Sequence, residues 1–587
     1  MPSVWRVAAP LIALVCLAVL PGIVSEYSVT LMNYIGLATL VSLGLVLLTG
    51  VAGQTSFGQA AFVGIGAYTS AVLTTGYGLS PWMSLPIVLL VSGLTAWLIG
   101  AITLRMSGHY LPLGTIAWGI SLYYLFGNIE GLGGFGGISD IPVLRLAGFE
   151  LQDLGRYYYL IWTVVVLALW ACANLLDSRQ GRAIRALKAR ASMIESFGVD
   201  PAGLRIRVLV LAALLAALSG WLYAHMQRFI NPTPFSPIAG IEYLFMAVIG
   251  GAGGVLGAVL GAFTFTALKE ALQTLLQAFD TTGPYELIVF GLLIILMLHH
   301  ARDGLFPLLR PLLPARRALS AGSGAVLEPV QRAAADDPLL VVDRVTRRFG
   351  GLVAVDDISL TMRRGEILGL IGPNGAGKST LFNLITGMLP LSAGQIRFAG
   401  KRIDGQSPHT IARLGVARSF QHVKLIGQMT VLENVAIGAS LRATSGVTAT
   451  CLRLDHREER ALLAEAARQL ERVGLGAHAH EMAGSLPLGK QRIVEIARAL
   501  CADPMLLLLD EPAAGLRYQE KQELAALLRE LRTQRMSILL VEHDMDFVMS
   551  LTDRLVVLHF GSKLAEGTPT DIQRNPDVLE AYLGGIE

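Results

Sequence analysis

The sequence predicts an α-helical membrane domain with several spans, followed by an α/β domain built on a mainly parallel sheet. Only 16% of the 587 residues are charged and the mean hydropathy is +0.55, values too apolar for one soluble domain. Apolar runs fill the first half, whereas short apolar strands alternate with helical stretches from Leu339 onward. We therefore expect a membrane domain at residues 1–310, a flexible linker rich in Pro, Ala, Arg, Ser and Gly at 311–338, and a second domain at 339–587.

The apolar runs of the first half are close to the roughly 20 residues that a helix needs to cross hydrocarbon. Basic residues near Arg6, Arg105 and 178–207 place those segments in the cytoplasm by the positive-inside rule. The expected spans are 7–24, 28–50, 55–75, 82–104, 109–127, 157–175, 206–226 and 285–300.

The stretch 239–278 is interrupted by Gly250–Gly254 and is expected to form either a re-entrant pair or two crossings. Its glycines either line a translocation path or pack helices through small residues, and the second interpretation is at least as well supported. A charge costs at least about 2.5 kcal/mol at the bilayer centre, so ionisable groups in apolar runs should face protein or water. These groups are Glu242, Lys269, Glu270 and Glu286.

A phosphate-binding loop organises the second domain. The pattern G-x-x-x-x-G-K-[ST] is filled by Gly372, Gly377, Lys378 and Ser379, between an apolar run and a helical run. Glycines let consecutive N–H groups point into one concavity at a helix N-terminus, which suits phosphate oxygens. Lys378 is expected to reach the β- and γ-phosphates of ATP, and the Ser379 hydroxyl to ligate Mg2+. The predicted nucleotide-binding residues here are Gly372, Pro373, Asn374, Gly375, Ala376, Gly377, Lys378, Ser379 and Thr380.

Further polar residues downstream complete an ATP-hydrolysing site. A buried strand ends at Asp510, predicted to hold Mg2+, and Glu511, predicted to polarise the attacking water. His543 is expected to orient that water, and Gln421 to act both as a catalytic residue and as a neutral ligand of Mg2+. Phe349 is predicted to stack on adenine. Taken alone, His543 would be an ordinary surface histidine and Phe349 a core residue.

With these residues assembled, residues 339–587 resemble an ABC transporter ATPase. Phe349 is similar to its adenine-stacking position, Gly372–Thr380 to its Walker A motif, Gln421 to its Q-loop, Asp510–Glu511 to its Walker B motif and His543 to its switch histidine. Within that family the chain resembles the LivG branch through Ala417–His422, Asp510–Leu516 and Ala581–Gly584. Residues 1–310 resemble the LivM permease through Gly53–Phe62, Ile65–Tyr68, Gly181–Leu187 and Gly250–Gly254.

This resemblance implies a polytopic α-helical membrane domain followed by a P-loop α/β ABC ATPase domain, fused in one subunit of a binding-protein-dependent importer. The implied substrates are branched-chain or other hydrophobic amino acids. Urea, short amides and aromatic or organic acids are alternatives within the family, and an exporter or an ATP-gated regulator is an alternative outside it. The implied location is the bacterial inner membrane, with the ATPase domain in the cytoplasm.

Partners are implied by the same resemblance. They are a LivH-like permease, a LivF-like ATPase and a periplasmic substrate-binding protein, although a homodimer of the fusion remains an alternative. The lipid bilayer is a further partner, whereas the formal net charge of +3 gives no basis for nucleic-acid binding.

Two positions depart from the family pattern. The signature segment, L-S-G-G-Q in the family, falls at Leu486, Pro487, Leu488, Gly489 and Lys490. Pro487 has neither a hydroxyl nor an N–H to offer a γ-phosphate, and Arg517 takes the place of the D-loop aspartate. Because each ATP lies between one domain's Walker A and the other's signature in this family, we expect an asymmetric dimer. The site that uses this chain's signature segment should hydrolyse ATP weakly.

The basic segment around residues 181–200 alternates apolar and charged positions at helical spacing and ends at Gly198. One interpretation is a cationic anchor on anionic lipid. The other, which we favour because the same chain supplies a nucleotide-binding domain, is a coupling helix that docks in a groove on such a domain. Its predicted coupling residues are Gly181, Arg185, Glu195 and Gly198.

Overall fold

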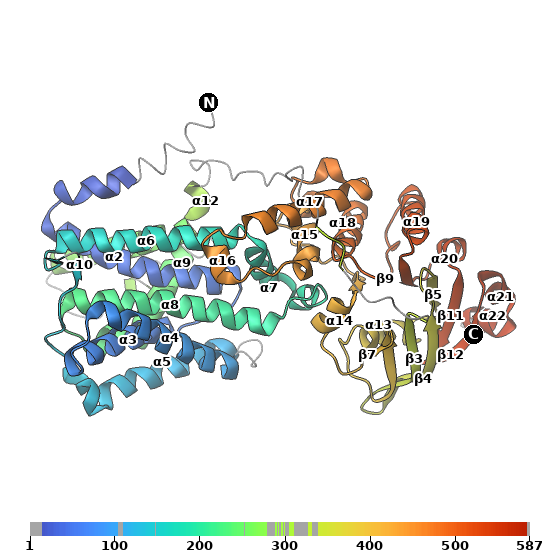
Figure 1. The fold of residues 1–587 in the computed structure, drawn as a ribbon, viewed down its shortest axis with the longest axis horizontal. Coiled ribbons are helices and arrows are strands. Elements are labelled where there is room, and N and C mark those ends of the chain that lie inside the picture. Colours follow the sequence, from blue (N-terminus) through green and yellow to red (C-terminus); the bar gives the residue numbers. More distant parts are fainter. Residues whose placement is uncertain are drawn as a thin grey trace. The chain divides into compact units, whose positions relative to one another are not determined.

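The computed structural model describes residues 14–103, 110–146, 148–251, 253–278, 304–309, 327–330 and 338–583, with positions 288, 289, 291, 292, 295, 296 and 299. The protein divides into two compact units, whose elements are labelled in Figure 1. The first consists of Met1–Asp177, Ala202–Arg317 and Thr450–Arg453, and the second of Ser178–Pro201, Ala318–Ala449 and Leu454–Glu587. The predicted coupling segment therefore folds with the second unit.

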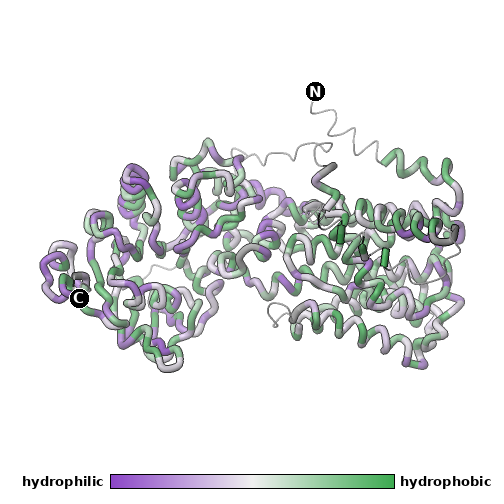
Figure 2. The backbone as a smooth tube through the Cα atoms, turned by 180° about the vertical axis from the view of Figure 1, so that it is seen from behind, coloured by the Kyte–Doolittle hydropathy of each residue, from purple (hydrophilic) through white to green (hydrophobic). Residues whose placement is uncertain are grey.

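The first unit is helical, and apolar residues dominate its helices (Figure 2). Its helices are α2 (Glu26–Leu45), α3 (Gln59–Ala71), α4 (Pro81–Thr103), α5 (Tyr110–Asn128), α6 (Leu154–Leu176), α8 (Pro201–Gln227), α9 (Pro237–Gly250), α10 (Leu256–Ala278) and α12 (Phe306–Leu309). The π-helical turns η2 (Val46–Val51) and η3 (Val72–Gly76) extend α2 and α3. A short hairpin, β1 (Arg145–Leu146) and β2 (Phe149–Glu150), precedes α6.

Four helical stretches in the described part of the chain are long and apolar enough to cross a membrane: Glu26–Val51, Pro81–Thr103, Leu154–Leu176 and Pro201–Gln227. They confirm the predicted spans at 28–50, 82–104, 157–175 and 206–226 to within a few residues. Helices α3 with η3, and α5, cover the runs predicted at 55–75 and 109–127. Of the span predicted at 7–24, residues 14–19 are α-helical and are followed by η1 (Leu20–Gly22). Its residues 7–13, most of the span at 285–300 and most of the linker at 311–338 lie outside the described residues.

The glycine cluster separates α9 from α10 and lets the two helices meet backbone to backbone. A Cβ added to Gly250 would overlap the carbonyl oxygen of Gly257, and one added to Gly261 would overlap that of Met246. This geometry fits helix packing through small residues, while a role in the translocation path stays a prediction. Lys269 Nζ lies 2.7 Å from Glu242 Oε1, so these two ionisable groups of the membrane unit face each other as expected.

The second unit contains two sheets that share one apolar core. The larger has the order β12-β11-β5-β10-β9-β8, in which all pairs are parallel except β11 with β12. Its strands are β5 (Ile367–Ile371), β8 (Val416–Arg418), β9 (Leu506–Asp510), β10 (Ser537–Val541), β11 (Arg554–His559) and β12 (Ser562–Gly567). The smaller sheet is antiparallel and consists of β3 (Leu340–Phe349), β4 (Leu352–Met362), β6 (Ala393–Phe398) and β7 (Lys401–Arg402).

Strands β5, β9 and β10 are buried at every position, as continuous apolar runs in a parallel sheet require. Because they run parallel, their carboxyl ends meet at one edge of the sheet, the usual place for ligands in α/β folds. The helices of this unit are α7 (Arg179–Glu195), α13 (Lys378–Ile385), α14 (Pro408–Leu414), α15 (Val431–Gly438), α17 (His456–Arg472), α18 (Leu488–Cys501), α19 (Tyr518–Thr533), α20 (Met545–Leu551), α21 (Pro569–Arg574) and α22 (Pro576–Leu583). Helix α16 spans Val447–Cys451.

Candidate functional site: an ATP site and a docked helix

The phosphate loop connects β5 to α13, as the motif predicts. Gly372, Gly375 and Gly377 have φ values of 150°, 82° and 96°, which L-residues with a side chain rarely adopt. A Cβ on Gly372 would overlap the carbonyl oxygen of Leu558, and one on Gly377 would lie 2.5 Å from that of Ala354. Nothing lies within 4 Å of the Cβ position of Gly375, so space for a ligand remains above the loop. The loop can therefore present its N–H groups to phosphate.

Lys378 begins α13 and is buried against the loop. Its Nζ donates hydrogen bonds to the carbonyl oxygens of Gly372 at 2.6 Å and Pro373 at 2.9 Å. Burial lowers the pKa of Lys378, and the charges of Glu511 and Asp510 oppose that shift. The lysine thus stands between the loop and the two carboxylates, where a phosphate with its metal would bind. Ser379 is exposed and Thr380 is half-buried beside it.

Asp510 is held at the end of β9 by a partner that sequence analysis missed. Its Oδ2 accepts a hydrogen bond from Arg418 Nη2 at 3.2 Å, and both side chains are almost fully buried. Burial raises the pKa of Asp510, while the Arg418 guanidinium opposes the shift. The second carboxylate oxygen, Oδ1, is buried without a hydrogen-bond partner in the described part of the chain. A buried carboxylate oxygen with no donor in the described part of the chain suits Mg2+ and its waters.

Gln421 and Glu511, both predicted to be catalytic residues, are joined by a hydrogen bond. Gln421 Nε2 donates to Glu511 Oε2 at 3.1 Å. Glu511 has a φ of 47°, a conformation that costs a non-glycine residue on the order of 1–3 kcal/mol. Two hydrogen bonds hold it there: its N–H donates to Val541 O at 2.9 Å, and its carbonyl accepts from Arg492 Nη1 at 2.9 Å. Arg492 was also missed by sequence analysis, because no motif separates it from Arg498, the other arginine of α18.

His543 and Phe349 are the two predicted residues that stand apart from this cluster. The His543 side chain is 62% exposed, and its Nδ1 lies 3.7 Å from Glu542 Oε2. Within the described residues, no hydrogen bond joins it to Gln421 or Glu511. Phe349 is 41% exposed and carries the Arg347 guanidinium 4.5 Å above its ring. This exposure excludes a core position for Phe349.

The signature segment is tied into its own domain. Leu486 is buried, Pro487 precedes α18 as its N-cap, and Leu488 is 51% exposed. Lys490 Nζ hydrogen-bonds His478 Nε2 at 2.8 Å, and His478 Nδ1 in turn lies 2.8 Å from Glu481 Oε1. A Cβ on Gly489 would lie 2.5 Å from Glu520 Oε1. Arg517 stands at the start of α19, where its backbone N–H donates to Glu520 Oε2 at 2.8 Å.

Helix α7 docks within the second unit through three arginines on one face. Arg179 donates from Nη1 to Ser440 O at 2.7 Å and to Ala443 O at 3.0 Å. Arg182 is 1% exposed and binds Glu459 with both guanidinium nitrogens, Nη2 to Oε2 at 3.1 Å. The i, i+3 spacing of Arg179, Arg182 and Arg185 places them on one side of the helix; of these three, the sequence analysis named only Arg185 as a coupling residue.

The four predicted coupling residues all lie in this docked segment. Gly181 is in the first turn of α7, where its N–H donates to the N-cap Ser178 Oγ at 3.4 Å. Arg185 Nη2 lies 3.2 Å from Glu433 Oε1. Burial raises the pKa of Glu195, and His409 opposes the shift. Gly198 has a φ of 77°, and a Cβ there would overlap the Leu441 side chain. The buried Arg182 excludes a helix that contacts only lipid and water.

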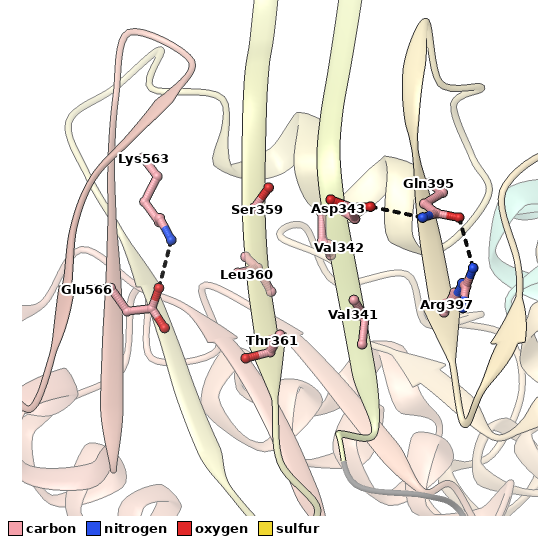
Figure 3. A pocket seen from close by; sticks show the side chains of 10 residues that line it. All are labelled: Val341, Val342, Asp343, Ser359, Leu360, Thr361, Gln395, Arg397, Lys563 and Glu566. Atoms are coloured by element: carbon pink, nitrogen blue, oxygen red, sulfur yellow. Dashed lines mark hydrogen bonds and ion pairs between the residues drawn. The ribbon is translucent and has the colours of Figure 1, made fainter.

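A separate hollow of about 500 Å³ lies across β3, β4, β6 and β12 (Figure 3). Its polar lining includes the pairs Lys563–Glu566 and Asp343–Gln395, whose nitrogen and oxygen atoms are each 2.9 Å apart. None of the residues predicted to bind ATP lines it. The hollow is therefore distinct from the phosphate loop.

Comparisons with known proteins agree with these observations. A family model described as branched-chain amino acid transport system / permease component matches residues 27–298. The models for ABC transporter and for branched-chain amino acid ATP-binding cassette transporter match residues 355–514 and 562–587.

Several curated proteins are similar to the ATPase part. The high-affinity branched-chain amino acid transport ATP-binding protein LivG of Salmonella typhimurium is 46% identical over 250 residues, 42% of this chain and 98% of the relative. BraF of Pseudomonas aeruginosa, with the same description, is 44% identical over the same shares. A crystal structure of a nucleotide-free ATP-binding cassette aligns with 31% identity and a TM-score of 0.38, covering 42% of this chain and 98% of that one.

Fold, site and family matches together define a membrane permease joined in one chain to an ABC ATPase that binds and hydrolyses ATP to drive transport. The chain belongs to the branched-chain amino acid family of ABC transporters. The predicted resemblance is thus confirmed, as is the predicted fold class. The individual roles of the site residues remain predictions.

Proposed function

We propose that this chain is the fused permease–ATPase subunit of an importer that moves branched-chain amino acids inward across the bacterial inner membrane. The observation that carries the proposal is the presence, in one chain, of a permease match over residues 27–298 and an ATP site with Lys378, Asp510 and Glu511. In this proposal residues 1–310 are the permease domain, 311–338 the linker and 339–587 the ATPase domain.

At the ATP site, the loop N–H groups and Lys378 hold the phosphates, and Phe349 stacks on the adenine. Ser379, Gln421 and Asp510 would hold Mg2+, which neutralises charge on the phosphate oxygens when bound. Glu511 accepts a proton from the attacking water, and Gln421 keeps that carboxylate in place through its 3.1 Å hydrogen bond. His543, exposed in this structure, would reach the water only after a change of its side-chain position or on association with a partner.

Transmission to the permease runs through α7. ATP draws two ATPase domains together, and a helix held by buried ion pairs moves with the domain on which it is docked. Arg182 and Arg185 provide that hold through Glu459 and Glu433. The permease then changes the side of the membrane to which its pathway opens, provided that ATP favours the closed state by several kcal/mol.

The complex needs a second half, because one ATP site requires the signature of a second ATPase. We infer a LivH-like permease, a LivF-like ATPase and a periplasmic binding protein as partners, with a homodimer as the alternative. The chain's own signature segment, with Pro487, Lys490 and Arg517, then faces the ATP bound by the partner and supports weak hydrolysis there.

Transport by the complex in proteoliposomes tests the proposal. Labelled leucine should enter vesicles only with ATP on the ATPase side and binding protein on the other side. Lys378→Ala should abolish uptake, whereas Lys401→Ala, an exposed lysine of the same unit, should not. Full uptake by Lys378→Ala would refute the proposal. Competition by urea, short amides or aromatic acids in place of leucine would assign another substrate, and activity that does not need the binding protein would favour an exporter.

The need for ATP hydrolysis distinguishes a transporter from an ATP-gated regulator. In a regulator, Glu511→Gln would keep full function because ATP binding suffices. In the proposed importer the same variant stops repeated cycles of uptake.

A further inference from the structure

A segment of irregular backbone, residues 52–58, interrupts the helices of the membrane unit between η2 and α3. Neighbouring helices hold this backbone in place. The Phe57 N–H donates to Thr115 Oγ1 of α5 at 3.2 Å, and a Cβ on Gly58 would lie 3.0 Å from the Thr115 carbonyl oxygen. On another side, a Cβ on Gly240 of α9 would overlap the Phe57 carbonyl oxygen. The segment is therefore packed against α5 and α9.

The segment ends at a helix start that lies within the membrane layer. Helix α3 begins at Gln59 and runs alongside α8, a stretch long and apolar enough to span a membrane. A Cβ on Gly66 would overlap the carbonyl oxygen of Ala217, and Ser70 Oγ lies 2.8 Å from His225 Nε2, so the two helices run in the same direction. Gln59 precedes Gly66 by seven residues, roughly 10 Å of helix. The start of α3 therefore lies beside the interior of the α8 span and not at either end of it.

Two glutamines at this break have side chains without a partner. Gln54 and Gln59 are 5% and 0% exposed. Within the described residues, neither the amide oxygen nor the amide nitrogen of either side chain has a hydrogen-bond partner. Because helical side chains lean toward the N-terminus of their helix, the Gln59 amide lies toward the start of α3. A buried amide without a partner is unfavourable for folding, so stability alone does not account for these two side chains.

The chemistry of the break matches one end of an amino acid. The NH2 group of each glutamine amide can donate two hydrogen bonds. The first N–H groups of a helix and the positive end of its dipole favour an anion at the same place. A transported amino acid carries a carboxylate, and a charge in the membrane interior requires polar groups in place of water. The start of α3 and the two amides can supply those groups.

We propose that the start of α3, with Gln54 and Gln59, is a binding site for the carboxylate of the amino acid on its way through the permease. This inference rests on the proposed import function and assigns residues to its pathway. In this structure both amides are packed against protein, so the site becomes accessible when the permease changes the side to which its pathway opens. Because every amino acid has a carboxylate, the site contributes to transport of each substrate and does not select among their side chains.

The test is Gln59→Met, alone and with Gln54→Met, in the assembled complex in proteoliposomes supplied with binding protein and ATP. Methionine is about as long as glutamine and lacks the amide. Loss of hydrogen bonds to a charged group predicts leucine uptake about 10- to 100-fold slower. The melting temperature should stay the same or rise, because each substitution removes an unpartnered amide from the interior. Gln59→Glu puts a negative charge where the carboxylate binds and should slow uptake at least as much.

Tyr68→Phe is the matched control on the same helix. The Tyr68 side chain is 2% exposed, and its hydroxyl likewise has no hydrogen-bond partner in the described part of the chain. It follows Gln59 by nine residues, roughly 13 Å along α3. Its removal should leave uptake unchanged. An equal loss of uptake in Tyr68→Phe would show that the effect is not specific to the break and would overturn the proposal.

Slower uptake at an unchanged or higher melting temperature supports the proposal. Normal uptake in the methionine variants overturns it. A melting temperature that falls together with uptake also overturns it, because the amides then stabilise the fold through buried water. Normal uptake in Gln59→Glu excludes a carboxylate as the ligand. The unchanged complex and Lys378→Ala, assayed in parallel, test the proposed function separately: if the unchanged complex takes up no leucine, or Lys378→Ala takes it up fully, the importer proposal itself is wrong.

Discussion

The ATPase unit has two segments that face nucleotide in an ABC dimer, and they are built very differently. In the phosphate loop, Gly372 and Gly377 occupy positions that admit no side chain, and the loop lies beside Lys378 and two carboxylates. In the signature segment, proline stands where a serine is expected, and Lys490 is hydrogen-bonded to His478 of its own domain. In the assembly that we propose, this chain carries one well-equipped half of an ATP site and one weakened half, so we expect its hydrolysis to depend on the signature of a partner.

Glu511→Gln has the largest expected effect and tests the catalytic residues beside the phosphate loop. The amide is of nearly the same size and can still hydrogen-bond Gln421, but it cannot accept the proton of the attacking water. Loss of a general base lowers hydrolysis by about 10²- to 10⁴-fold. Steady-state ATPase assays and ATP binding should show lost turnover with retained binding. Glu523→Gln, an exposed carboxylate on α19, is the control, and hydrolysis that survives at the normal rate in Glu511→Gln would mean that the partner's site does most of the work.

Arg182→Ala has the next largest expected effect. It tests whether the motion of the ATPase domain can fail to reach the permease while the phosphate loop and the signature segment both stay intact. The change leaves Glu459, 13% exposed, without its charge partner, and breaking a buried pair costs about 3–5 kcal/mol. Docking of α7 should weaken, so uptake should fall far more than the ATPase rate. Uptake and ATPase rate, measured on the same vesicles, give the amount of amino acid taken up per ATP hydrolysed. Arg457→Ala changes an exposed arginine of α17 and should leave uptake per ATP hydrolysed unchanged. Equal losses of uptake and ATPase rate in Arg182→Ala would contradict the assignment.

Two glycine-to-alanine variants, one in the phosphate loop and one in the signature segment, compare the two segments directly. Gly377→Ala puts a side chain at a φ of 96° and 2.5 Å from the Ala354 carbonyl oxygen, a backbone atom that cannot turn away. The strain of about 1–3 kcal/mol should weaken ATP binding about 5- to 100-fold. Gly489→Ala meets only the carboxylate end of Glu520, which can move.

Titration with a fluorescent ATP analogue measures both glycine variants. Gly489→Ala should keep the affinity of the chain's own phosphate loop. A comparable loss of ATP affinity in both variants would show that the signature segment contributes to ATP binding as much as the phosphate loop does. The proposed difference between the two segments would then be wrong.

The sequence predicted the parts of this site that depend on local spacing. A phosphate loop between a strand and a helix, and carboxylates at the end of an apolar strand, follow from a few consecutive residues, and the structure has both. Likewise, apolar and charged positions that alternate at helical spacing predicted a helix near residues 181–198, and α7 spans Arg179–Glu195.

Pairings that join distant residues could not be predicted in this way. Arg418 and Asp510 are 92 residues apart, and Arg182 and Glu459 are 277 apart, so only the packed fold brings each pair together. A sequence motif also does not predict where a side chain at the end of a strand points. His543 has the expected position in the chain, yet its ring is mostly exposed.

Restoring the family residues in the signature segment should have the smallest effect. Pro487→Ser restores a hydroxyl at the N-terminus of α18, alone or with Lys490→Gln, which also frees this position from His478. If the partner's ATP is hydrolysed weakly only because this signature is incomplete, a second working site raises the ATPase rate of the complex by at most about two-fold.

Pro569→Ser, at the first turn of α21, controls for the loss of a proline at a helix start. The rate should be compared in complexes that also carry Glu511→Gln, where the repaired site would be the main source of turnover and its gain easiest to see. A rate that stays unchanged after the repair would argue that Pro487 does not limit hydrolysis, and that the two ATP sites differ for reasons that lie in the partner rather than in this chain.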